Sequence, residues 1–141
     1  MGEVAERCDF RVGDCIEKKY IVEHTIGEGA FGKVFRVKTS KDGLIKALKL
    51  FKFWELNPDV RNEMIARTQM EFETGQIHSN YLVHSLESGM IQGNPYIVME
   101  YCSNGDLRNY INSHQEVDLI KIGKEILYGL SDLHKERFIV I

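Results

Sequence analysis

Hydrophobic positions gather in five short segments that are separated by polar and turn-forming residues, and this pattern predicts strands. The segments are rich in β-branched and aromatic residues, and they cover positions 20–26, 33–39, 44–51, 81–91 and 95–101. Glycine-containing turns, KDG at 41–43 and QGN at 92–94, join neighbouring segments as in β-hairpins. The pattern therefore predicts an antiparallel sheet of five strands.

Other segments have apolar residues at helical spacing. Asn57 and Pro58 are typical of the N-cap and first position of a helix, which we expect to reach about residue 77. A short helix begins in NGDLRNYIN, and Ser113 with Glu116 forms a capping box before a longer helix. The apolar stripe of this longer helix consists of Leu119, Ile122, Ile126, Leu130 and Leu133. The order of strands, helix, strands and helices indicates an α+β fold.

Composition narrows the class of protein. The 141 residues are 43% hydrophobic and 28% charged, which fits one globular unit with a core. A formal net charge of −3 argues against binding to nucleic acid or to a membrane surface. No apolar run approaches the length of a membrane span. Three cysteines without CxxC spacing indicate reduced thiols and a cytoplasmic protein, and the histidines show no metal-like spacing.

Three glycines interrupt the first pair of predicted strands, in TIGEGAFGKVFRV. Gly27, Gly29 and Gly32 follow the spacing GxGxxG, which by itself is weak evidence for a nucleotide. The dinucleotide-binding version of this motif precedes a helix, whereas KVFRVKT after Gly32 has the pattern of a strand. A glycine-rich hairpin remains, whose backbone N–H groups can cover phosphates because no side chains intervene. A bulged hairpin without a ligand is the alternative.

Residues beyond the glycines favour the nucleotide. Ala47 and Lys49 share one face of the strand at 44–51. At this point the chain resembles the protein-kinase family: GEGAFGKV is similar to the GxGxxGxV loop of that family, and KALK to its V-A-I-K strand. IVMEYCSNGDL looks like the linker between the two kinase lobes, and IKIGKEILYGLSDLH like the helix that leads to the catalytic loop. The resemblance covers residues 20–138.

This resemblance implies a site for ATP. Lys49 would hold the α- and β-phosphates under the glycines, Met99 would lie at the back of the adenine pocket, and the backbone of Glu100 and Cys102 would pair with the adenine edge. Asp106 would reach the ribose, or else it caps a helix. The residues implied at the ATP site are Ile26, Gly27, Glu28, Gly29, Ala30, Phe31, Gly32, Lys33, Val34, Ala47, Lys49, Met99, Glu100, Cys102 and Asp106.

The family also pairs its strand lysine with a helical acid. A count back from YLV without gaps reaches Met70, which carries no charge. Glu71 fits if the connection is one residue shorter, and Glu73 has the better helical neighbours. We prefer Glu71 and keep Glu73 as the alternative.

The resemblance divides the chain into an N-terminal extension (1–19), an ATP-binding small lobe (20–101), and the hinge with the first two helices of an incomplete large lobe (102–141). No H-R-D and no D-F-G triplet occurs in the sequence, so the general base and the magnesium ligands of the family are not among these residues. We therefore expect this polypeptide alone not to transfer phosphate.

The parent protein would phosphorylate Ser or Thr in proteins, with Tyr as the other choice. A pseudokinase or scaffold module, binding nucleotide or a protein partner without catalysis, is the competing hypothesis, and a small-molecule kinase is a third. The apolar helix at 119–133 normally faces the rest of the large lobe, so we expect it to be exposed here and to support self-association.

Overall fold

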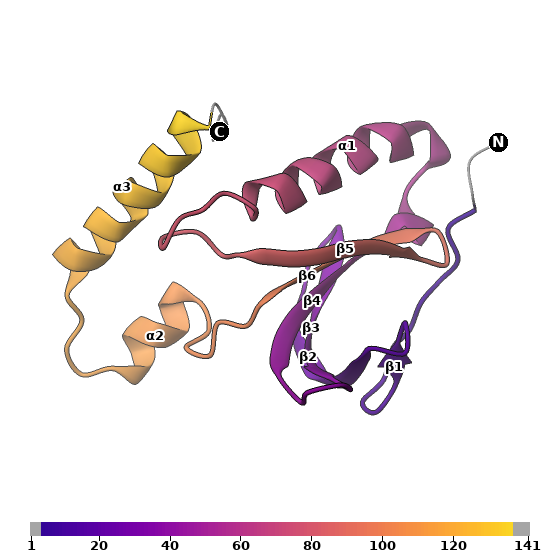
Figure 1. Cartoon of the computed structure of the whole chain (residues 1–141), viewed down its shortest axis with the longest axis horizontal. Coiled ribbons are helices and arrows are strands. Elements are labelled where there is room, and N and C mark those ends of the chain that lie inside the picture. The colour runs from indigo at the N-terminus through magenta and orange to yellow at the C-terminus, as the bar shows by residue number, and fades with distance from the viewer. Residues whose placement is uncertain (1–3, 137–141) are drawn as a thin grey trace.

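The computed structural model describes residues 4–136 as a curled antiparallel sheet, a long helix against one face of it, and two helices at one end (Figure 1). The strands are β1 (Cys15–Ile16), β2 (Tyr20–Glu28), β3 (Gly32–Thr39), β4 (Ile45–Phe51), β5 (Ser85–Ile91) and β6 (Asn94–Glu100). The helices are η1 (Phe53–Glu55, a 3-10 turn), α1 (Pro58–Thr74), α2 (Leu107–Ser113) and α3 (Leu119–Lys135). The sheet order is β1-β2-β3-β4-β6-β5. The predicted α+β fold class is confirmed, and β1 is a short sixth strand that the sequence pattern did not indicate.

Helix α1 begins where the sequence predicted and ends earlier. The side chain of Asn57 accepts a hydrogen bond from the Asp59 N–H at 3.0 Å, so Asn57 is the N-cap. The predicted end near residue 77 is wrong, because Gly75 is already the C-cap. A Cβ on Gly75 would lie 1.8 Å from the Ser85 hydroxyl. The chain therefore leaves the helix at a glycine because the start of β5 packs directly against it.

Strand β5 is shorter than the predicted segment 81–91. Residues 81 and 82 contact α3 instead of extending the strand: a Cβ on Gly129 would lie 3.1 Å from the Tyr81 carbonyl oxygen, and the rings of Tyr81 and Tyr128 are 5.2 Å apart. Ser79 also donates to the Asp132 carboxylate at 2.5 Å. The hydrophobic residues before Ser85 suggested a longer strand, but Tyr81 and Leu82 contact α3 instead.

The predicted capping box at Ser113 and Glu116 is wrong. Ser113 is the last residue of α2, and its hydroxyl donates to the Tyr110 carbonyl at 3.2 Å. The N-cap of α3 is Asp118, whose carboxylate accepts from the Lys121 N–H at 3.0 Å. Glu116 precedes the helix, so it cannot close a box from inside the first turn.

The two faces of the sheet carry two clusters of buried side chains. Alternate residues of β4 and β6 separate them: Leu48 and Leu50 belong to one cluster, whereas Phe51 and Ile97 pack against α1 in the other. We call the first side the outer face and the second the helix face. The buried residues of the outer face are Cys8, Ile16, Tyr20, Val22, Phe35, Val37, Leu48, Leu50, Tyr96 and Val98.

The outer face is covered by the N-terminal segment (residues 4–16), which descends along the sheet before β1 (Figure 1). Cys8 is buried there as a free thiol, and the ring of Phe10 meets that of Phe35 edge to face at 6.1 Å. The pKa of Cys8 is raised, chiefly by its burial. Residues that the sequence suggested as an extension thus contribute to the main core.

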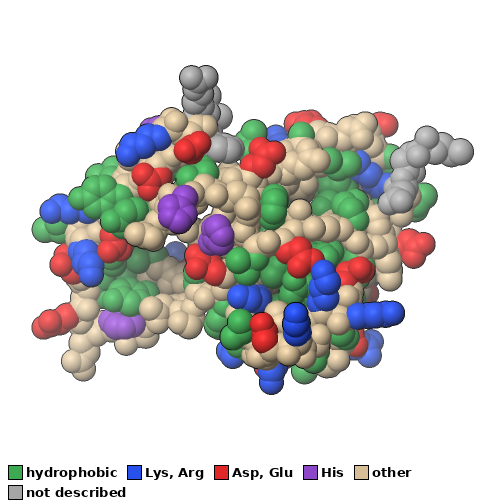
Figure 2. All heavy atoms as spheres, viewed as in Figure 1, with side chains coloured by type: hydrophobic (Ala, Val, Ile, Leu, Met, Phe, Trp, Pro, Cys, Tyr) green, Lys and Arg blue, Asp and Glu red, His purple; other side chains and the backbone are tan. Residues whose placement is uncertain are grey.

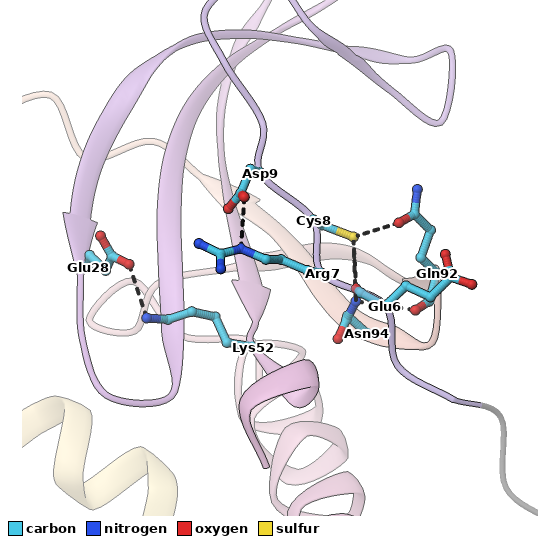
Figure 3. A network of polar contacts seen from close by, with 8 residues as sticks. All are labelled: Glu6, Arg7, Cys8, Asp9, Glu28, Lys52, Gln92 and Asn94. Carbon is cyan, nitrogen blue, oxygen red and sulfur yellow. Dashed lines mark hydrogen bonds and ion pairs between the residues drawn. The ribbon is translucent and has the colours of Figure 1, made fainter.

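Asn94 fastens the N-terminal segment to the sheet (Figure 3). Its side chain has no exposed surface. Its amide nitrogen donates to the Glu6 carbonyl at 2.7 Å, and its amide oxygen accepts from the Trp54 N–H at 3.2 Å. One side chain therefore joins the N-terminal segment, the β5–β6 turn and η1.

The apolar stripe of α3 is only partly exposed. Leu133 is buried and Ile122 and Leu130 are half-buried, because α3 packs against residues 79–82. Leu119 and Ile126 are 64% and 52% exposed. Hydrophobic surface is visible on the α3 side of the molecule in Figure 2. The expected exposure of the stripe is therefore present at Leu119 and Ile126 and absent at Leu133.

Candidate functional site

The glycine-rich loop (residues 27–32) joins β2 to β3 and closes through a hydrogen bond from the Gly29 N–H to the Gly32 carbonyl, 2.9 Å long. A Cβ on Gly27 or Gly29 would meet no atom within 4 Å, and neither residue has a positive φ. Neither the backbone conformation nor the packing of this chain therefore requires glycine at these two positions. Because these two residues have no side chain, the backbone of the loop stays accessible to a ligand.

Gly32 has a different reason for being glycine. A Cβ at this position would lie 3.1 Å from the Leu50 carbonyl oxygen and 3.5 Å from the Lys49 side chain. The glycine thus lets β3 approach β4 closely beside Lys49. The three glycines serve two purposes, an open loop and a close contact with the lysine strand.

Lys49 lies below this loop on β4. Cross-strand register places it opposite Val34 of β3, which in turn is opposite Gly27 of β2. Its Nζ donates to Oε1 of Glu71 on α1 at 2.7 Å, a charge-assisted hydrogen bond. Its side chain is 28% exposed, and the Phe51 ring lies 4.9 Å from Nζ. The hydrogen bond to Glu71 on helix α1 therefore sets the direction of the Lys49 ammonium group.

The two candidate acids of α1 lie in different places. Glu71 holds Lys49, whereas Glu73 lines a cavity of about 460 Å³ between α1 and the strands β5 and β6. Residues two apart on a helix point about 200° apart, so only one of them can face β4. The geometry selects Glu71 as the partner of Lys49.

An apolar surface flanks the lysine on the helix face. Ala47 is 7% exposed and lies opposite Met99 of β6, which is half-buried beside the α1 cluster. Val34 is half-buried, and Ile26 at the end of β2 is 46% exposed. The structure thus brings Val34, Ala47 and Met99 around Lys49 on three adjacent strands.

Side chains at the tip of the loop do not join this group. Phe31 is 56% exposed and Ala30 is exposed beside it. Glu28 and Lys33 lie opposite each other across the hairpin, one position along from Val34, so their side chains point to the outer face. Glu28 and Lys33 therefore offer only their backbone on the side of Lys49.

The linker after β6 offers mainly backbone. The Glu100 carboxylate accepts from the His84 N–H at 2.9 Å. Cys102 is a free thiol on the surface, and its pKa is raised, first by the partial loss of water around the sulfur and then by the charge of Glu100. Asp106 is the N-cap of α2, where its carboxylate accepts from the Asn109 N–H at 2.8 Å. The helix-cap alternative for Asp106 is therefore present in the structure.

This arrangement of loop, lysine and linker coincides with a known domain. The protein kinase domain family matches residues 20–140. The chain belongs to the protein kinase family. Its relatives include serine/threonine-protein kinase Nek1 of Mus musculus, 31% identical over 127 residues that make up 86% of this chain and 10% of that protein.

Two further relatives come from distant organisms. Serine/threonine-protein kinase pkn3 of Myxococcus xanthus is 30% identical over 131 residues, 89% of this chain and 23% of the relative. Serine/threonine-protein kinase greatwall of Xenopus laevis is 28% identical over 157 aligned positions, 99% of this chain and 17% of the relative. This kinase chain therefore spans less than a quarter of the length of each of these relatives.

The part of this kinase domain that the structure describes lacks a metal centre. Among residues 4–136, no three His, Cys, Asp or Glu side chains gather as metal ligands would. The open glycines and the ammonium of Lys49 fit a polyphosphate, whereas the described residues offer no set of ligands for magnesium.

Within the same residues, no helix combines the length and hydrophobicity needed to cross a bilayer. Residues 137–140 of the family match lie outside the described residues.

Sequence reasoning missed one residue beside the loop of this kinase domain, Lys52. Its Nζ donates to Glu28 at 3.0 Å and lies 3.7 Å from the Glu55 carboxylate. Its side chain is only 9% exposed, and its N–H donates to the Phe31 carbonyl at 2.9 Å. No spacing rule relates a lysine to an acid 24 positions earlier, so the sequence carried no signal for this contact.

Proposed function

We propose that this chain is the ATP-binding part of a protein kinase that transfers the γ-phosphate of ATP to Ser or Thr hydroxyls of proteins. The observation that carries the proposal is the ion pair between Lys49 and Glu71 beneath a loop whose Gly27 and Gly29 leave room for a ligand. The similarity to kinases whose names specify serine and threonine supports the choice of acceptor.

Each part of the site then has a task that its chemistry suits. Backbone N–H groups of the glycine-rich loop bind the β- and γ-phosphates. Lys49, oriented by Glu71, neutralises charge on the α- and β-phosphates, because phosphoryl transfer depends on positioning and electrostatic stabilisation. Val34 and Ala47 contact the adenine from above, Met99 lies behind it, and the backbone of Glu100 and Cys102 pairs with its edge.

Magnesium would supply positive charge to the phosphates in reactions of this kind, and the described residues form no ligand set for it. The sequence likewise holds no H-R-D and no D-F-G triplet. The 141 residues therefore bind nucleotide without transferring phosphate by themselves. Catalysis by the whole protein depends on residues other than these.

A scaffold that binds only proteins is the competing function. Such a module has no need of open glycines at 27 and 29, where a side chain would meet no atom of the protein. It also has no need of a lysine held by Glu71 at 2.7 Å. Both features favour a nucleotide site.

Nucleotide binding by this chain tests the proposal. Calorimetry with ATP and with adenosine should show binding of both to the unaltered chain. Lys49→Met should weaken ATP by at least about tenfold, since hydrogen bonds to charged groups contribute about 1.5–3 kcal/mol, and should leave adenosine unchanged. Lys46→Met, on the same strand but the opposite face, is the control.

Equal ATP affinity in the Lys49→Met variant and the unaltered chain would contradict the site. The same preparations, given labelled ATP and a mixture of proteins, should yield no labelled product. Turnover by the 141-residue chain would contradict the division of tasks between these residues and the rest of the kinase.

A further inference from the structure

A negative side chain stands in the middle of the loop that we assign to phosphates. Glu28 lies between Gly27 and Gly29. Like charges repel by about 1 kcal/mol at 4 Å even in bulk water, so a carboxylate on the phosphate side of the loop would oppose the binding of a triphosphate. The structure contains a feature that removes this conflict.

Glu28 is directed to the outer face of the sheet. It lies opposite Lys33 in the β2–β3 hairpin, and Lys33 shares a face with Phe35, whose ring is 5.4 Å from the Lys33 ammonium. Phe35 is part of the outer-face core. Gly27, Val34 and Lys49 occupy the neighbouring row of the sheet, which faces the other way.

Lys52 holds the carboxylate in this place (Figure 3). Its ammonium donates to Glu28 at 3.0 Å, although its own side chain is only 9% exposed. A lysine removed from water in this way requires a paired charge. The hydrogen bond from Lys52 is also the main cause that lowers the pKa of Glu28, with smaller help from Lys33.

The position of Lys52 is in turn fixed by its backbone. Its N–H donates to the Phe31 carbonyl in the loop, and its carbonyl accepts from the Glu55 N–H at 3.1 Å in η1. The next turn residue, Trp54, donates its N–H to the buried side chain of Asn94. Lys52 therefore contacts both ends of the loop from a rigid part of the fold.

We propose that Lys52 is a positioning residue that holds the Glu28 carboxylate on the outer face, so that the glycine-rich loop presents only backbone N–H groups to a triphosphate. The inference rests on the proposed nucleotide-binding function. It concerns the phosphates alone, because adenosine has none. Lys52 acts through Glu28 and does not touch the ligand.

Calorimetry with ATP and adenosine on three variants and the unaltered chain tests this role. Lys52→Met leaves Glu28 charged and unheld, so ATP should bind about threefold to fivefold more weakly, the range expected for an ion pair near the surface. Adenosine should bind as before. Glu28→Gln removes the charge that Lys52 holds, so it should bind ATP more tightly than Lys52→Met does, and the double variant should match Glu28→Gln.

Glu28→Asp provides a second route if Lys52→Met fails to fold. The Glu28 side chain is 53% exposed, so folding tolerates the change, and the shorter acid keeps its charge but loses its reach to Lys52. ATP binding should weaken more in Glu28→Asp than in Glu28→Gln. Lys19→Met is the matched control, because it removes another 3.0 Å lysine–glutamate pair, to Glu87, away from the loop.

Three results would overturn the inference in distinguishable ways. An equal loss of ATP and adenosine in Lys52→Met would show a purely structural role. A double variant as weak for ATP as Lys52→Met would show that the Glu28 carboxylate is not the object of the restraint. Absence of ATP binding by the unaltered chain would remove the proposed function itself, and this inference with it.

Discussion

At the scale of single residues, Asn94 illustrates how one polar side chain can hold separate segments together. Buried amides are stable only when their groups are hydrogen-bonded. Asn94 meets this condition with acceptors and donors from two other segments, the Glu6 carbonyl and the Trp54 N–H. It does so next to Gly93, where φ is +79° and a Cβ would lie 2.7 Å from the Val4 carbonyl.

Asn94→Ala should lower the free energy of unfolding by on the order of 2 kcal/mol, because it removes a fully buried side chain and leaves the part-buried Glu6 carbonyl and Trp54 N–H without these partners. Denaturant titration followed by the single tryptophan, Trp54, measures the loss directly at the affected site. The exposed Asn104 supplies the control, and Asn104→Ala should change stability by less than about 0.5 kcal/mol. A loss as small as the control's would show that the Asn94 contacts do not stabilise the fold.

At the scale of elements, the N-terminal segment has a larger role than its sequence suggests. It contains a strand of only two residues, paired with the start of β2 through Cys15 and Ile16. Its apolar side chains nevertheless cover the outer face, where Phe35 and Leu48 have no exposed surface. The sequence of this segment shows only a weak strand pattern, because the residues that hold it in place lie on strands far along the chain.

Removal of residues 1–10 should therefore destabilise the domain by about 3 kcal/mol or more, since it takes Cys8 and Phe10 from the core. Thermal unfolding followed by circular dichroism compares this shortened chain with one that lacks only residues 1–3. An unchanged midpoint in the shorter chain would mean that the outer face is stable without its cover.

The same scale shows where prediction from sequence succeeds. The start of α1 and the hairpin turns were predicted because Asn57, Pro58, Gly43 and Gly93 act through their own backbone conformation. The end of α1 and the start of β5 were not, because Gly75 and Ser85 meet through space. The choice between Glu71 and Glu73 was likewise open until α1 was placed against β4.

At the scale of the whole molecule, α2 and α3 extend from the end of the sheet (Figure 1) and leave apolar surface uncovered. Helix α3 is held by residues 79–82, where Ser79 bonds Asp132 and Tyr81 meets Tyr128. The opposite side of α3 has no such cover among the described residues. The most exposed apolar side chains of α3 as a whole are Leu119, Ile120, Ile126, Leu127 and Tyr128.

We therefore expect the chain to self-associate as its concentration rises, because contiguous exposed apolar surface favours contact with another surface. Light scattering coupled to size exclusion should show a mass above 16.3 kDa that falls on dilution. Ile120→Glu with Leu127→Glu should restore the monomer, whereas Val12→Glu, at a residue 74% exposed elsewhere, should not. A monomer at every concentration would contradict the expectation.

Local chemistry determined what the sequence alone could establish: the strand and helix segments, their turns and caps, the glycine spacing, and the lysine whose setting resembles a kinase. These signals depend on residues within a few positions of one another. Tertiary structure decided which acid meets Lys49, how Glu28 is turned away by Lys52, and how the N-terminal segment joins the core. Such contacts connect residues more than twenty positions apart, and only the folded backbone determines which of them come within reach.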